Sequence, residues 1–241
     1  MNRIAGKLGR LPAKVPGGLK LLTEYHAQSL PVAPASVPVP SVQAWPMCAN
    51  DQLGDCTLAA AVHCDQAWSA DTRTAYSYPS DRAVVDQYLA LTGGVDSGLV
   101  EADVLRQWAT VGLFGKKIAG YAPVRLGTAV ELRQVVAFYG AVYAGVRMPS
   151  IAMQQFQDGQ PWALTGTSAD YDLAGGHAVP VVAYGPTELF VVTWGQIQPV
   201  TWDWWQTYAE EAWAVLSSEI VAAGGYVGLD VAQLQADISS L

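Results

Sequence analysis

Charge is scarce in this sequence, and basic residues are scarcer than acidic ones. Only 14% of the 241 residues are charged, with 13 Lys and Arg against 21 Asp and Glu, which gives a formal net charge of −8. Proteins that bind nucleic acid neutralise phosphates with clustered Lys and Arg. The sequence has no such cluster, so its composition argues against a nucleic-acid partner.

Cysteine is also rare, and the three residues are Cys48, Cys56 and Cys64. An odd number leaves at least one thiol unpaired, so the chain is not a disulfide scaffold, and a reducing compartment is favoured. We therefore expect a cytoplasmic or virion-associated protein. Cysteines and histidines do not cluster at a metal-ligand spacing, and a glycine-rich phosphate loop is missing, so we expect no metal and no small-molecule cofactor.

Long apolar runs are missing as well. The longest nearly uncharged stretch, residues 178–202, is interrupted by glycines and prolines and contains Glu188, which argues against a membrane span. The basic start of the chain has no apolar run behind it, so it does not resemble a secretory signal. Since 51% of the residues are hydrophobic, we expect a soluble protein with a large buried core.

Proline spacing divides the chain into two parts. Residues 1–44 include LPVAPASVPVP, in which closely spaced prolines fix the backbone angle φ and remove amide donors. This pattern predicts an extended N-terminal arm, partly polyproline II, and a flexible linker is the alternative interpretation. Residues 45–241 are expected to form a single domain.

Within that domain the periodicity of apolar residues changes near residue 117. Before it, capping signals and helix formers predict helices over residues 55–67, 81–91 and 100–111. After it, valine-rich and aromatic runs predict strands over residues 117–124, 141–149, 177–186 and 188–195, the last two as a hairpin. Only one further helix, residues 128–139, is expected before a terminal helix at 230–241. The fold class is therefore α+β, with a helical lobe, an antiparallel β lobe and a cleft between them.

Cys56 lies where a nucleophile would be useful, at the predicted start of the first helix. The partial positive charge of a helix N-terminus stabilises a thiolate, and so does a nearby imidazolium. His63 is too far along the same helix, about 10 Å by rise, and His26 lies in the arm. His177 follows two glycines and precedes an apolar strand, which suits a rigidly mounted base. The alternative is that His177 only starts a strand and Cys56 is a small buried apolar residue.

Several motifs together resemble the papain-like cysteine peptidase superfamily. They are NDQLGDCT at residues 50–57, GAVYAGV at 140–146, GGHAVPVVAYG at 175–185 and FVVTWG at 190–195. The resemblance covers roughly residues 45–218 and is nearest to the branch that processes bacteriocin leaders at a double glycine, and to phage and bacterial proteins with an NDxLGDCT motif. That branch usually has glutamine where this chain has Asn50.

The resemblance implies a papain-like fold in which Cys56 attacks a carbonyl and His177 moves the proton through an acyl-enzyme. The oxyanion would be held by the Cys56 backbone N–H and by the side-chain amide of Asn50 or Gln52. The family orients its histidine with Asn or Asp, but counting places Thr193 there and aligning on Trp-Gly places Val192. A threonine hydroxyl supplies no negative charge, so activity could be reduced or absent.

Two functions remain open on this basis. The first is a thiol peptidase or amide hydrolase that acts on a peptide or protein. The second is a catalytically weak or inactive structural protein of the same fold, for instance a phage virion component whose arm binds a neighbouring protein. An inhibitory role of the arm is a third alternative. Residues 193–213 hold five of the nine tryptophans, which predicts either core packing or an aromatic wall for a ligand.

Overall fold

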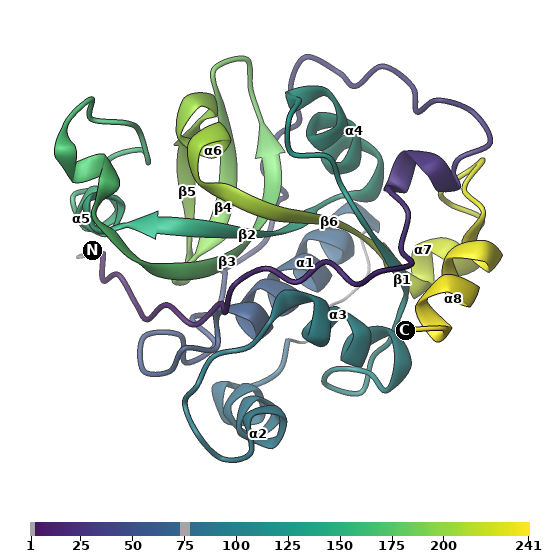
Figure 1. Ribbon diagram of the computed structural model, residues 1–241, viewed down its shortest axis with the longest axis horizontal. Coiled ribbons are helices and arrows are strands. Elements are labelled where there is room, and N and C mark those ends of the chain that lie inside the picture. Colours follow the sequence, from purple (N-terminus) through teal and green to yellow (C-terminus); the bar gives the residue numbers. More distant parts are fainter. Residues whose placement is uncertain (1–2, 73–77) are drawn as a thin grey trace.

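A six-stranded antiparallel sheet, with α1, α2 and α3 gathered along one side of it, forms the body of the protein (Figure 1). The computed structural model describes residues 3–72 and 78–241. The helices are α1 (Cys56–Thr72), α2 (Asp81–Thr92), α3 (Glu101–Thr110), α4 (Ala129–Tyr139), α5 (Ser150–Gln157), α6 (Trp202–Tyr208), α7 (Ser218–Ala222) and α8 (Val231–Ser239), and 3-10 turns lie at Leu22–Tyr25 and Ser168–Tyr171.

The sheet contains β1 (Ile118–Pro123), β2 (Val142–Pro149), β3 (Leu173–Tyr184), β4 (Glu188–Thr193), β5 (Gln196–Thr201) and β6 (Ala209–Ser217). Its strand order is β1-β6-β2-β3-β4-β5. Residues 177–184 of β3 are buried throughout, because α1 packs against this strand. The start of α1 and the middle of β3 therefore meet at the junction between the helical lobe (α1 to α3) and the β lobe (the sheet).

The predicted α+β class is confirmed, and most of the predicted elements are present. The expected hairpin is formed by β3 and β4, in which Val181 pairs with Val191. The expectation of only one further helix before the terminal helix was wrong, because α5, α6 and α7 also form, and β5 and β6 were not predicted. The missed helices are at most 8 residues long, too short for a helical period to show in the sequence. Pro199 in β5 and two glutamates at the start of β6 hid those strands.

The tryptophan-rich stretch is mainly core. Trp194, Trp204, Trp205 and Trp213 are buried, and only Trp202 is partly exposed. Outside that stretch, the buried Trp162 stacks on Trp204 with ring centroids 4.9 Å apart. The core interpretation therefore describes this segment better than an exposed aromatic wall.

The proline-rich arm packs on its own domain. The Ala27 N–H donates to the Gly228 carbonyl at 3.0 Å, and the Gln134 side-chain amide donates to the Pro31 carbonyl at 2.9 Å. The arm begins by crossing the molecule between the sheet and the helices α2 and α3, as the purple trace in Figure 1 shows. Among the described residues, no helix is both long and apolar enough to cross a membrane.

Candidate functional site

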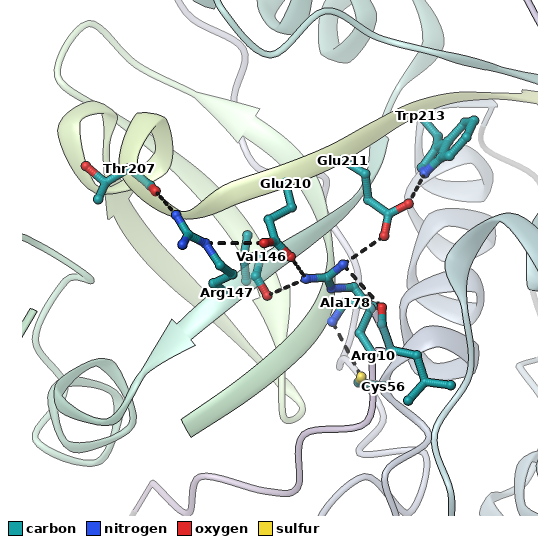
Figure 2. Close-up of polar contacts among 10 residues, drawn as sticks. Arg10, Cys56, Val146, Arg147, Ala178, Thr207, Glu210, Glu211 and Trp213 are labelled. Atoms are coloured by element: carbon teal, nitrogen blue, oxygen red, sulfur yellow. Dashed lines mark hydrogen bonds and ion pairs between the residues drawn. The ribbon is translucent and has the colours of Figure 1, made fainter. Parts of the chain in front are cut away.

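Cys56 is the first residue of α1, where the sequence predicted it. The helix starts here because the Leu58 and Ala59 amides both donate to the Asp55 carbonyl, at 2.8 and 3.1 Å. The Cys56 thiol is only 1% exposed, and its sulfur accepts a hydrogen bond from the Ala178 amide of β3 at 3.4 Å (Figure 2). The sulfur therefore contacts the backbone directly after His177.

His177 lies in β3 and is also buried. Its Nε2 forms a hydrogen bond with the Thr193 hydroxyl at 2.7 Å, and its ring stacks on Trp194 with centroids 4.8 Å apart. Its Nδ1 is buried and has no hydrogen-bond partner among the residues that the structure describes. The structure thus brings His177 and Thr193 into contact and places Cys56 next to the same strand, whereas Val192 is not the residue that holds the imidazole.

A tight turn fixes the ring that covers His177. Trp194 and Gly195 link β4 to β5, and both have positive φ, +44° and +72°. Because Thr193 pairs with Gln196 across them, the two residues form the kind of two-residue hairpin turn that requires left-handed backbone. Trp194 is a costly residue at such a position, and the turn holds its indole against the imidazole. The TWG motif was noted in the sequence, but its contact with His177 was not predicted.

The two candidate oxyanion donors differ in exposure. Asn50 is buried, and its Nδ2 donates to the Leu53 carbonyl at 3.0 Å and to the Lys7 carbonyl at 3.2 Å. Gln52 is exposed. Asn50 therefore binds a carbonyl oxygen of the arm from a buried position, whereas Gln52 is exposed.

The remaining cysteines and histidines have other surroundings. Cys48 and Cys64 are buried free thiols. The His63 ring bonds the Pro46 carbonyl at 2.8 Å, and the His26 ring contacts the Tyr139 hydroxyl. In the described part of the chain, no group of three acidic, histidine or cysteine residues could hold a metal ion.

The N-terminal segment, residues 6–11, lies between the two lobes directly beside these groups. Its backbone bonds both the loops that precede α1 and α3 and the β lobe. Lys7 N–H donates to the Asn50 carbonyl at 2.7 Å, Leu99 N–H donates to the Gly9 carbonyl at 2.9 Å, and Arg10 N–H donates to the Gly176 carbonyl at 3.1 Å. The segment therefore fills the cleft that the sequence predicted.

Two glycines allow this close approach. A Cβ on Gly9 would overlap the Gly54 backbone, and a Cβ on Gly6 would overlap the Asn50 carbonyl and the Trp194 ring. The Gly9 amide also lies near enough to the Cys56 sulfur to lower the pKa of the thiol. Any side chain larger than hydrogen at Gly6 or Gly9 would therefore push the segment away from the site.

Burial under the segment determines the protonation of the pair. Burial raises the pKa of the Cys56 thiol to about 12. Burial, together with the positive charge of Arg10, lowers the pKa of His177 to about 3. The sequence predicted that the helix N-terminus would favour a thiolate, but in this arrangement desolvation outweighs that effect. Both groups are neutral near pH 7.

Sequence reasoning missed Arg10, whose guanidinium forms ion pairs with Glu210 and Glu211 of β6 (Figure 2). The available signal was Glu211, a carboxylate directly before the apolar run of its strand. That signal predicts a buried acid but does not identify the cation with which it pairs.

The fold is shared with cysteine proteases of known structure. Xylellain, a cysteine protease from Xylella fastidiosa, is 14% identical with a TM-score of 0.64, over 90% of this chain and 98% of that one. The proform of the ragweed pollen cysteine protease Amb a 11 is 16% identical with a TM-score of 0.57, over 81% of this chain and 62% of that one. Procathepsin L 3 from Tenebrio molitor larval midgut is 15% identical with a TM-score of 0.54, over 89% and 76% of the two chains.

These similarities establish the papain-like fold and no more, since all three identities are low. No family model matches the chain, and no curated protein sequence matches it. The narrower resemblance to the double-glycine branch is not confirmed by these structures.

Proposed function

We propose that the protein is a thiol peptidase or a related amide hydrolase that uses Cys56 and His177. The observation on which this rests is the bonding of the imidazole. Its Nε2 is held by Thr193, its buried Nδ1 is left without a described partner, and the Cys56 sulfur bonds the amide of Ala178, the residue next to His177. A base needs one nitrogen to be oriented and the other to be free for the nucleophile.

In the proposed reaction the Cys56 sulfur attacks the carbonyl carbon of a peptide, and His177 takes the thiol proton. His177 then gives the proton to the leaving amine, and water hydrolyses the acyl-enzyme. The Cys56 backbone N–H and the Asn50 side-chain amide would stabilise the oxyanion. Asn50 is suited to this because its Nδ2 already donates to a carbonyl oxygen, that of Lys7.

We further propose that the N-terminal segment holds the enzyme latent. It places the Gly9 amide near the Cys56 sulfur, where the amide lowers the pKa of the thiol, and an N–H group cannot be attacked as a carbonyl carbon can. Two of the similar structures are proforms, which supports this proposal. Opening the site would expose the thiol and the imidazole to water and remove the burial that keeps both neutral.

An opening variant, Gly6→Ala with Gly9→Ala, tests the proposal on the full chain, because both added methyl groups meet backbone. Gly17→Ala is the matched control, since no atom lies within 4 Å of a Cβ built there. We expect iodoacetamide to label Cys56 faster than Cys48 and Cys64 in the opening variant only. His177→Ala in the opening variant should abolish this preference. Trypsin cleavage after Arg10 reports independently that the segment has opened.

If trypsin cuts after Arg10 and the three cysteines still react slowly and equally, the hydrolase proposal is wrong. The inactive structural protein would then be favoured, and its N-terminal arm would be examined for binding to a partner protein. If labelling is selective, peptides with a Gly-Gly pair before the scissile bond are the first substrates to test, because the sequence resembles leader-processing peptidases.

A further inference from the structure

Arg10 is buried although it belongs to the N-terminal segment, and its side chain is only 1% exposed. Its guanidinium reaches acceptors in two directions, as Figure 2 shows. Nη1 donates to the Glu211 carboxylate at 2.9 Å, and Nη2 donates to the Val146 carbonyl at 3.3 Å and to the Glu210 carboxylate. The planar fork of arginine suits this arrangement better than a point charge does.

The Arg10 side chain has room because position 145 of β2 is glycine and carries no side chain. A Cβ on Gly145 of β2 would lie 2.5 Å from Arg10 Cδ and 2.8 Å from Glu101 Oε1. Glycine at this position therefore leaves room for the arginine stem beside a third carboxyl group. We call the surroundings of this side chain the Arg10 pocket; its residues are Glu101, Gly145, Val146, Glu210 and Glu211.

The Arg10 pocket contains more carboxyl groups than the other cations of the fold pair with. Glu210 has a second partner in Arg147, whose Nε lies 3.3 Å from its carboxylate. Glu211 is buried and otherwise bonds only the neutral indole of Trp213 among the described contacts. Glu101 is fully buried, and burial together with the charge of Glu211 holds its pKa well above the usual range. Without Arg10 the buried Glu211 would lack a cation, which is strongly unfavourable.

The pocket lies one residue away from the reacting groups. Arg10 N–H bonds the carbonyl of Gly176, the residue before His177, and the amide of the preceding Gly9 lies near enough to the Cys56 sulfur to lower the pKa of the thiol. The bonds that position the segment here, to Gly176 and Leu99, use only peptide N–H and carbonyl groups. Any peptide with glycine at the position of Gly9 can make such bonds, so among such peptides the side chain that enters the pocket distinguishes one from another.

We propose that the Arg10 pocket is a substrate-binding site that selects peptides with an arginine side chain, and that Arg10 occupies it as an intramolecular ligand. This inference rests on the proposed function, because it names the substrate class of the same site. Lysine would supply the charge but not the two-sided fork, and a neutral side chain would leave Glu211 unpaired.

The test uses the full chain with Arg10→Ala, which empties the pocket, in the opening variant, in which residues 6–11 no longer cover the site. The probes are acetyl-Leu-Gly-Arg-Leu-amide and the same peptide with lysine or with citrulline, the neutral isostere of arginine. By calorimetric titration we expect the arginine peptide to bind at least about tenfold more tightly than the citrulline peptide, with lysine between them. Adding Gly145→Ala should abolish the preference, because the methyl group fills the pocket. Equal binding of the arginine and citrulline peptides would overturn the proposal.

Folding of the variant is part of the same experiment. If Arg10→Ala does not fold alone, it is refolded in the presence of each peptide. Folding with the arginine peptide but not with the citrulline peptide then supports the proposal. Folding with neither peptide contradicts it. Binding does not require the thiol, so an arginine preference without selective Cys56 labelling refutes only the proposed catalysis. If Cys56 is labelled selectively, but the arginine peptide slows this labelling no more than the citrulline peptide does, only the proposal for the Arg10 pocket is refuted.

Discussion

His177 and Thr193 lie on two neighbouring strands, and a 2.7 Å hydrogen bond joins the imidazole Nε2 to the threonine hydroxyl. The bond orients the ring without supplying a negative charge. An imidazolium formed at His177 would therefore be stabilised less than one that faces a carboxylate. Thr193 therefore orients the His177 ring, but it stabilises the charged form of the ring only weakly.

Removing the hydroxyl should lower activity modestly. In the opening variant, Thr193→Val should reduce kcat/KM about fivefold, because one buried neutral hydrogen bond contributes about 1 kcal/mol. Thr193→Ser keeps the hydroxyl and should retain activity. The pH profile of kcat/KM is the discriminating measurement, since a loss of orientation alters the apparent pKa of the base. If Thr193→Val leaves both kcat/KM and its pH profile unchanged, the contact has no catalytic role.

The reaction of Cys56 with iodoacetamide should depend steeply on pH in the unaltered chain. Since burial raises the pKa of this thiol to about 12, the thiolate fraction should rise about tenfold per pH unit between about pH 7 and about pH 9, with no plateau. In the opening variant the plateau should move to a lower pH. Rates can be followed by mass spectrometry of the Cys56 peptide. A plateau near neutral pH in the unaltered chain would contradict the closed arrangement.

Asn50 and Gln52 should differ sharply on substitution. In the opening variant, Asn50→Ala should lower kcat about a hundredfold, the usual loss when an oxyanion donor is removed. Gln52→Ala should leave kcat unchanged, because that side chain is exposed. Steady-state kinetics of both variants, with circular dichroism as a folding control, measure the difference. A larger effect at Gln52 would reverse the assignment.

Asp55 should make stability depend on pH. Burial raises the pKa of this carboxyl to about 7, so its contribution to stability is present below its ordinary pKa of 3.8 and is lost as the pH rises towards 7. We compare the free energy of unfolding of Asp55→Asn with that of the unaltered chain at about pH 5 and at about pH 8. The difference should shift by about 2 kcal/mol in favour of Asp55→Asn between these two pH values. Urea unfolding at both values measures this, and Asp51→Asn, at an exposed position, should show no such change.

The parts of the site that the sequence predicted are those encoded by local pattern or by short spacing. Cys56 follows from a helix-start signal, and Thr193 from the resemblance to the papain-like superfamily, which implies an orienting residue 16 positions after His177. Arg10 and Glu211 are 201 residues apart, and no local sequence pattern around either residue predicts that they pair. The position of the arm was unpredictable for a similar reason. Proline spacing predicts an extended chain but does not specify the surface on which that chain packs.

The short helices and the strands β5 and β6 were missed because tertiary contacts decide them. The sequence of α6 contains three tryptophans in seven residues, which is compatible with a strand or with a buried helix. Its helical state depends on the Thr201 hydroxyl, which accepts a hydrogen bond from the Trp204 amide, and on packing against Trp162. Such contacts are visible only once the sheet has formed.

The N-terminal segment belongs to the same molecule as the groups it covers, so its binding does not weaken on dilution. A tethered ligand acts at an effective concentration that is set by its linker, commonly in the millimolar range. The connecting residues 11–15 are exposed. A single backbone cleavage there would turn an intramolecular equilibrium into a bimolecular one, in which the released peptide diffuses away and protein concentration begins to matter.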